Sequence, residues 1–63
     1  GNEMTKQEAM NHGAKAKIRG AYFMQAAGNQ EFMDAIKGQP DAMYLMTAYT
    51  EGFALQSLGL KVR

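Results

Sequence analysis

Small residues recur along the first part of this 63-residue chain at the spacing of one helix face. Successive residues of a helix are about 100° apart, so alanines and glycines at every third or fourth position form one narrow stripe. The stripe consists of Ala9, Gly13, Ala16, Gly20 and Ala27, with Phe23 beside it. A glycine inside a helix costs about 1 kcal/mol relative to alanine. Two of them on one stripe therefore indicate that another helix backbone packs closely there. We favour a later helix of the same chain as the partner, and the alternative is a dimer seam.

Capping signals predict where the first two helices begin and end. Thr5 and Glu8 have the spacing of a capping box, which predicts a helix from Lys6 to Ala27. The following Gly28 and Asn29 tolerate the left-handed backbone that often ends a helix. Asn29 is also expected to cap a short second helix over residues 30–37.

The third predicted helix lies between a capping signal at its start and a glycine at its end. Gly38 and Pro40 end the second helix, and Asp41 is the expected N-cap of a third helix, Ala42 to Leu58. Gly59 is the expected C-terminal stop. The pattern predicts an all-α fold in which residues 1–63 form a single domain. We expect an antiparallel helical hairpin with a short connecting helix.

The size of the chain favours self-association. A domain this small buries only about 60% of the surface that its unfolded chain exposes, so its own core gives marginal stability. Disulfides are excluded because there is no cysteine, and one histidine cannot build the common zinc sites. We therefore expect a homo-oligomer, with a dimer favoured, and neither a metal nor a cofactor.

The predicted third helix is apolar on both sides. Its expected inner face contains Ala42, Leu45, Met46, Ala48, Tyr49, Gly52, Phe53 and Leu55. Gly52 is the residue of this face that we expect in close helix packing. A monomeric hairpin would leave Met43, Tyr44, Ala54 and Leu58 in water, and contiguous exposure of this kind usually marks an interaction surface. We interpret these four residues as a protein interface.

No residue pattern supports catalysis. His12 is the only imidazole, and Glu8 one turn earlier could orient it as a base, but an ordinary surface histidine is the favoured interpretation. Glu31 and Asp34 share a helix face without the oxygen-rich loop of a cation site, so we interpret them as solvated. The sequence predicts that the protein is not an enzyme.

Basic residues form a loose cluster. His12, Lys15 and Arg19 make a ridge on the first helix, and Lys61 and Arg63 lie at the end of the chain. With an antiparallel hairpin these groups would approach one another and could contact phosphates, although a solvated surface is the favoured interpretation. The net charge is only +1. The third helix has no Arg, Lys or Asn, so specific DNA readout in a helix-turn-helix manner is rejected.

The chain is expected to be cytoplasmic. No secretory signal is visible, and residues 42–60 contain Glu51 and several polar residues, which is too polar for a membrane span. Gly1 is either native or a residue left from cloning, and the chain is either free-standing or a fragment.

Two short segments are similar to a known family. The first is Ala9-Met-Asn-His-Gly13-Ala-Lys-Ala16-Lys-Ile18-Arg-Gly20, and the second is Tyr49-Thr-Glu-Gly52-Phe53. Together they resemble the small bacterial proteins typified by ribosome modulation factor, which are basic, bind small-subunit ribosomal RNA and promote dormant ribosome dimers. This chain is nearly neutral and lacks the family's basic N-terminal arm and central Cys-Pro. The resemblance implies a similar pairing of helices.

Two functions follow as hypotheses. The first is a regulatory or adaptor protein, of phage or prophage type, that acts through protein contacts. The second is a ribosome- or RNA-associated protein that uses the basic cluster.

Overall fold

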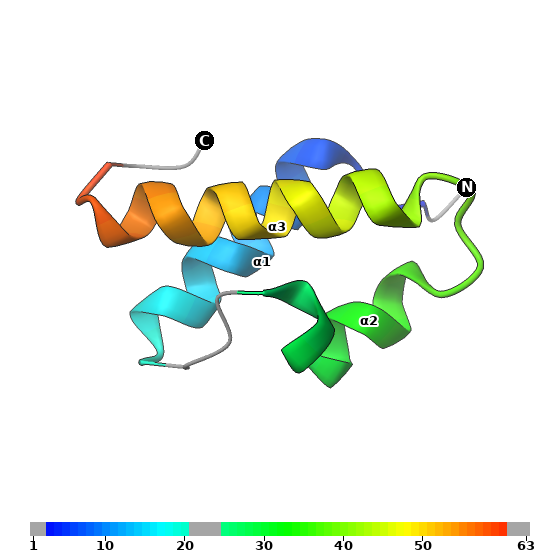
Figure 1. The fold of residues 1–63 in the computed structure, drawn as a ribbon, viewed down its shortest axis with the longest axis horizontal. Coiled ribbons are helices and arrows are strands. Elements are labelled where there is room, and N and C mark those ends of the chain that lie inside the picture. The colour runs from blue at the N-terminus through cyan, green and yellow to red at the C-terminus, as the bar shows by residue number, and fades with distance from the viewer. Residues whose placement is uncertain (1–2, 21–24, 61–63) are drawn as a thin grey trace.

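The computed structural model describes residues 3–20 and 25–60, and every regular element in these ranges is helical. In chain order they are α1 (Lys6–Ile18), the 3-10 turn η1 (Ala26–Gly28), α2 (Gln30–Ile36) and α3 (Ala42–Ser57), as Figure 1 shows. The prediction of an all-α fold is confirmed.

The capping box at the start of α1 is present. The Glu8 N–H donates to Thr5 Oγ1 at 3.2 Å, and the Thr5 N–H donates to Glu8 Oε1 at 2.8 Å. Both hydrogen bonds satisfy donors that the first turn of a helix leaves free. The predicted start of α1 at Lys6 is therefore confirmed.

The predicted end of the first helix is wrong. We expected the helix to continue to Ala27, but α1 ends at Ile18, and Gly20 adopts a φ of +78°. The Gly20 N–H donates to the Lys17 carbonyl at 3.0 Å. Glycine reaches this left-handed conformation without a Cβ clash, which makes it a common helix terminator. Residues 21–24, including Phe23 of the predicted stripe, lie outside the described residues.

α2 begins as predicted. The Asn29 side chain accepts a hydrogen bond from the Phe32 N–H at 3.0 Å, which is the expected N-cap interaction. The helix ends at Ile36, one residue earlier than expected, and Gly38 follows with a φ of +86°.

The ends of α3 are close to the prediction, but one cap differs. α3 starts at Ala42 and ends at Ser57, and Gly59 has a φ of +80° beyond its last turn. Asp41 occupies the N-cap position, yet its side chain makes no capping hydrogen bond. Its Oδ1 instead accepts from Gln39 Nε2 at 3.2 Å, so the expected role of Asp41 as a side-chain cap is wrong.

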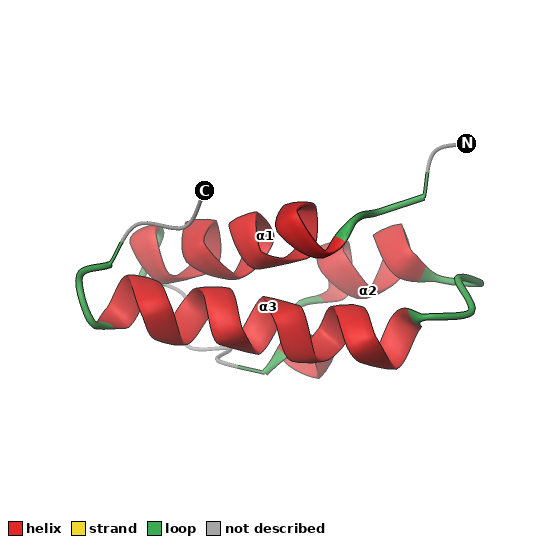
Figure 2. Ribbon diagram, turned by 90° about the horizontal axis from the view of Figure 1, so that it is seen from above, coloured by secondary structure: helices red, strands yellow, loops and turns green. Residues whose placement is uncertain are grey.

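α1 and α3 are packed directly against each other, as predicted, but they run in the same direction (Figure 2). Lys6 Nζ lies 5.9 Å from the centroid of the Tyr44 ring, and Lys17 Nζ lies 5.8 Å from that of Phe53. The beginnings of the two helices therefore lie at one end of the molecule. The antiparallel direction that we expected is corrected because α2 carries the chain back before α3 begins.

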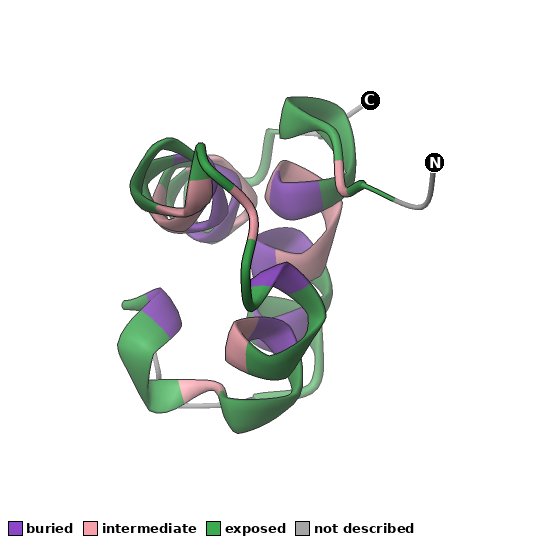
Figure 3. Ribbon diagram, turned by 90° about the vertical axis from the view of Figure 1, so that its right-hand side faces the viewer, coloured by how far each residue is buried: buried purple, intermediate pink, exposed green. Residues whose placement is uncertain are grey.

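The core lies between the three helices, and Figure 3 shows their buried segments turned towards one another. The largest fully buried side chains are Phe32, Ile36, Leu45 and Tyr49. The Phe32 and Tyr49 rings are 4.7 Å apart between centroids. α2 thus supplies two of the large side chains that fill the space beside the α1–α3 contact.

Candidate functional site

The small residues of α1 form its contact with α3. Ala9 and Ala16 are buried, and a Cβ on Gly13 would collide with the Tyr49 carbonyl oxygen and lie 2.8 Å from the Phe53 nitrogen. A Cβ on Gly52 would collide with the carbonyl oxygen of Met10. The two backbones can approach this closely only because both positions are glycine.

Gly20 does not belong to this contact. It lies beyond the end of α1, and a Cβ added to it would meet nothing within 4 Å. Our assignment of Gly20 to close helix packing is therefore wrong. Its position in the sequence stripe was coincidental, since the residue serves as a helix terminator.

The predicted protein-interface residues are exposed on α3 and, in the case of Leu58, at its C-cap. Met43 is 82% exposed, Leu58 is 75% exposed and Tyr44 is 54% exposed, and Ala54 is exposed as well. An uncharged stripe follows this side of the helix at every third or fourth residue. We call it the outer stripe, and it consists of Met43, Thr47, Thr50, Ala54 and Leu58.

The hydroxyl groups on and beside the outer stripe are satisfied within α3. Thr47 Oγ1 donates to the Met43 carbonyl at 3.2 Å, and Thr50 Oγ1 donates to the Met46 carbonyl at 3.2 Å. Ser57 Oγ donates to the Phe53 carbonyl at 2.9 Å. Covering a polar group is expensive when its hydrogen bond is lost. Because these hydrogen bonds lie within α3, another surface can cover the outer stripe without leaving a hydroxyl donor unpaired.

A shallow groove runs along one edge of the outer stripe. Its walls are Met43, Met46, Thr47 and Thr50 of α3, Ala26 and Ala27 of η1, and Gln25 just before η1. Ala27, which the sequence placed on the small-residue stripe of the first helix, is therefore an exposed residue of this groove.

Three residues of the predicted basic cluster meet at a second hollow. His12 and Lys15 of α1 and the C-cap residue Arg19 line it together with Ala16, Asn29 and Glu31. Neither Lys15 nor Arg19 forms an ion pair with any residue that the structure describes. The hollow thus presents two cationic groups to a ligand, and the negatively charged Glu31 carboxylate lines the same hollow. Lys61 and Arg63 lie outside the described residues.

The side chains considered for acid–base chemistry make contacts that belong to the fold. The His12 and Phe32 ring centroids are 5.6 Å apart with an interplanar angle of 62°, an edge-on contact. The Glu8 carboxylate accepts from the Thr5 N–H rather than from His12. Asp34 Oδ1 accepts from Gln30 Nε2 at 2.8 Å. Across residues 3–20 and 25–60, no three His, Asp or Glu side chains gather in a group that could hold a metal ion.

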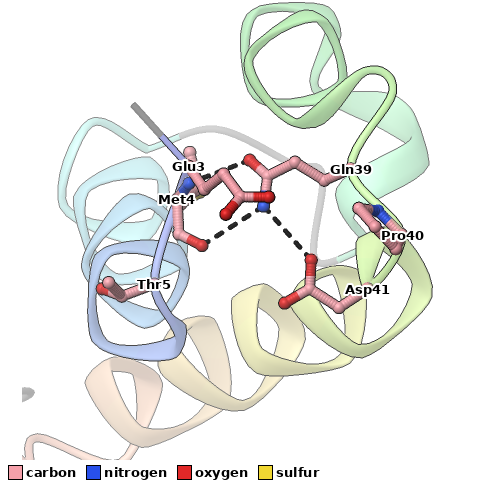
Figure 4. Close-up of a pocket in the computed structure, with 6 residues that line it drawn as sticks. All are labelled: Glu3, Met4, Thr5, Gln39, Pro40 and Asp41. Atoms are coloured by element: carbon pink, nitrogen blue, oxygen red, sulfur yellow. Dashed lines mark hydrogen bonds between the residues drawn. The ribbon is translucent and has the colours of Figure 1, made fainter. Parts of the chain in front are cut away.

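Sequence reasoning missed Gln39. Its Oε1 accepts from the Met4 N–H at 2.9 Å, and its Nε2 donates to the Met4 carbonyl at 3.3 Å (Figure 4). The side chain therefore joins the segment before α1 to the turn before α3, beside an open hollow that Pro40 and Asp41 also line. A glutamine in a polar turn carries no sequence signal for such a long-range contact.

Asn29 also has a role that its sequence position did not reveal. Its Nδ2 donates to the hydroxyl oxygen of buried Tyr49 at 3.1 Å, while its Oδ1 caps α2. One amide thus connects the start of α2 to the middle of α3.

No family model matches this chain, and no curated protein and no solved structure shows significant similarity to it. Among the described residues, no helix is both long and apolar enough to cross a membrane.

Proposed function

We propose that this protein is a small non-enzymatic regulatory or adaptor protein that acts by contact between its outer stripe and another protein surface. The observation that carries the proposal is the outer stripe itself. It is uncharged, it has large exposed apolar side chains at both ends, and its hydroxyl donors are satisfied internally. Exposed apolar surface of this kind is typical of interaction sites.

Affinity capture from the native host tests the proposal with two matched variants. Ala54 lies on the outer stripe and Ala35 lies on α2, and both alanines are exposed helical residues. We expect Ala54→Glu to lose captured proteins because a charge would have to be buried without a partner. Ala35→Glu should retain them. Equal capture by both variants would place the contact elsewhere.

A second candidate function is association with RNA, carried by the hollow where His12, Lys15 and Arg19 meet. Phosphate contacts by basic side chains dominate RNA affinity and weaken as salt is raised. The test is filter binding of ribosomal RNA at low salt. Lys15→Ala and Arg19→Ala should each weaken retention, whereas Lys37→Ala, an exposed lysine after α2, should not. Absence of retention by the unaltered protein would eliminate this function.

A further inference from the structure

We propose that the hollow between α1 and the start of α2 binds a small phosphate ester that carries a hydroxyl group beside its phosphate. Lys15 and Arg19 bind the phosphate, and Glu31 accepts a hydrogen bond from the hydroxyl. This is the surface of the second candidate function, but the inference does not require RNA, because a free ester offers the same two groups. It gives Glu31 a selective role that phosphate contacts alone leave unexplained.

One face of α1 and the start of α2 form the hollow. His12, Lys15 and Arg19 follow one another at intervals of three and four residues, which places them on one side of the helix. Ala16 lines the hollow between them, and its small side chain leaves that space open. The volume is about 130 Å³, well below the roughly 300 Å³ at which sites for drug-sized ligands begin. The hollow therefore accommodates one small ligand, or one group of a larger one.

Contacts that belong to the fold hold both sides of the hollow in place. The His12 ring packs edge-on against Phe32, which is fully buried. On the other side, the Asn29 side chain caps α2 and donates to the hydroxyl of Tyr49. A ligand therefore meets a hollow whose frame is already formed, and the entropic cost of binding falls mainly on the exposed charged side chains.

The charged groups of the hollow do not pair with one another. Lys15 and Arg19 come from α1 and its C-cap, and Glu31 comes from α2. Neither cation comes within the roughly 4 Å N···O distance of an ion pair to any carboxylate that the structure describes. The His12 nitrogens make no hydrogen bond to the same part of the chain. Donors and an acceptor thus line one hollow with their hydrogen-bonding capacity unused.

This combination of groups defines the chemistry of the ligand. Three side chains with N–H donors, those of His12, Lys15 and Arg19, favour an anion with several acceptor oxygens, and a phosphate offers more of them than a carboxylate does. A phosphate alone would be repelled by the Glu31 carboxylate. A hydroxyl on the neighbouring carbon offsets this repulsion, because its hydrogen bond to an ionised acceptor is one of the stronger kind.

The first experiment compares glycerol 3-phosphate with propyl phosphate, which has the same carbon chain and no hydroxyl group. His12 is the only histidine of the chain, so its imidazole signal in proton NMR reports on the hollow. At constant pH and ionic strength, we expect both esters to shift this signal saturably. Glycerol 3-phosphate should bind about three- to tenfold more tightly, equivalent to roughly 0.7–1.4 kcal/mol, as for one hydrogen bond.

Glu31→Gln tests the selective role. Loss of the negative charge should tighten binding of propyl phosphate and reduce the preference for glycerol 3-phosphate to less than about twofold. Asp34→Asn removes a negative charge from the same helix but outside the hollow, and it should retain the preference. The ratio of the two affinities is the decisive quantity, because a purely structural effect of either variant would change both affinities alike.

Lys15→Ala and Arg19→Ala test the phosphate contacts. Each should weaken binding of both esters several-fold and leave the ratio of their affinities nearly unchanged. Lys37→Ala, an exposed lysine after α2 that does not line the hollow, is the matched control. Circular dichroism verifies that each variant is folded.

Competition identifies the source of the ester. RNA carries a 2′-hydroxyl beside each 3′-phosphate, whereas DNA lacks this hydroxyl. If an RNA strand displaces glycerol 3-phosphate more effectively than a DNA strand of the same sequence, the natural ligand is a ribose phosphate of RNA. If neither strand displaces it, the natural ligand is a free ester.

The outcomes separate this inference from RNA association. Absence of a saturable His12 shift with glycerol 3-phosphate, or equal affinity of the unaltered protein for the two esters, would overturn the inference. If RNA is still retained through Lys15 and Arg19 in that case, the second candidate function stands and Glu31 has no selective role. Selective binding of glycerol 3-phosphate without RNA retention supports the inference and eliminates RNA association.

Discussion

Gly13 of α1 and Gly52 of α3 occupy reciprocal positions in the helix contact, each against the backbone of the opposite helix. Gly13 lies against Tyr49 and Phe53, and Gly52 lies against Met10. Neither position has room for one additional carbon atom. The reciprocal arrangement explains why this chain tolerates glycine in the middle of two helices despite its low helix propensity.

The first prediction is that Gly13→Ala and Gly52→Ala each destabilise the fold. Alanine would favour the isolated helix by about 1 kcal/mol, but its Cβ would collide with a carbonyl oxygen that belongs to the other helix. Overpacking of this kind typically costs about 1–3 kcal/mol, and more where backbone must move. We expect a net loss of about 1–2 kcal/mol in urea unfolding, a large share of the roughly 3–5 kcal/mol available to such a small core.

Gly20→Ala is the control for these variants. Its Cβ would meet no atom within 4 Å, so its cost arises only from the positive φ and should be about 1 kcal/mol. An unfolding midpoint for Gly13→Ala at or above that of the unaltered protein would disprove the close contact of α1 with α3.

The second prediction separates the two hydrogen bonds of Asn29. Asn29→Ala removes both the α2 cap and the donor to Tyr49, and each loss is expected to cost about 1 kcal/mol. Asn29→Asp retains a capping oxygen and loses only the Nδ2 donor. We therefore expect the order of unfolding free energies to be Asn, then Asp, then Ala. Equal values for the Asp and Ala variants would show that the cap contributes nothing.

The third prediction concerns the connection from Gln39 to Met4. Gln39→Ala removes both hydrogen bonds to the Met4 backbone and should release the segment before α1. Hydrogen exchange at the Met4 amide should accelerate, while exchange in the middle of α3 should change little. Gln30→Ala, which truncates an exposed glutamine on α2, is the matched control. Unchanged exchange at Met4 would contradict the connection.

The fourth prediction concerns the apolar surface of the outer stripe. Met43→Gln combined with Leu58→Gln should reduce the fluorescence of a dye that binds exposed apolar surface. The unfolding free energy should change by no more than about 0.5 kcal/mol, as is usual for exposed positions. Ile18→Gln is a useful comparison because Ile18 is 68% exposed but lies on α1, away from the outer stripe. If Ile18→Gln alone reduces the signal, the dye binds elsewhere.

The sequence by itself determined the local features of this protein. Thr5, Asn29 and Gly59 lie at helix boundaries as predicted, because capping interactions and left-handed stops depend on residues only a few positions apart. The exposed side of α3 was also predictable, since a helix buries one face and the periodicity of its residues identifies the other.

Only the tertiary structure decided how far α1 extends and which way it runs relative to α3. Glycine can either continue a helix at a modest cost or end it with a positive φ, so Gly13 and Gly20 are indistinguishable in the sequence. They differ because Gly13 lies under α3 and Gly20 does not. The parallel direction follows from the return path of α2, and the contacts of Gln39 with Met4 and of Asn29 with Tyr49 exist only because that path brings distant segments together.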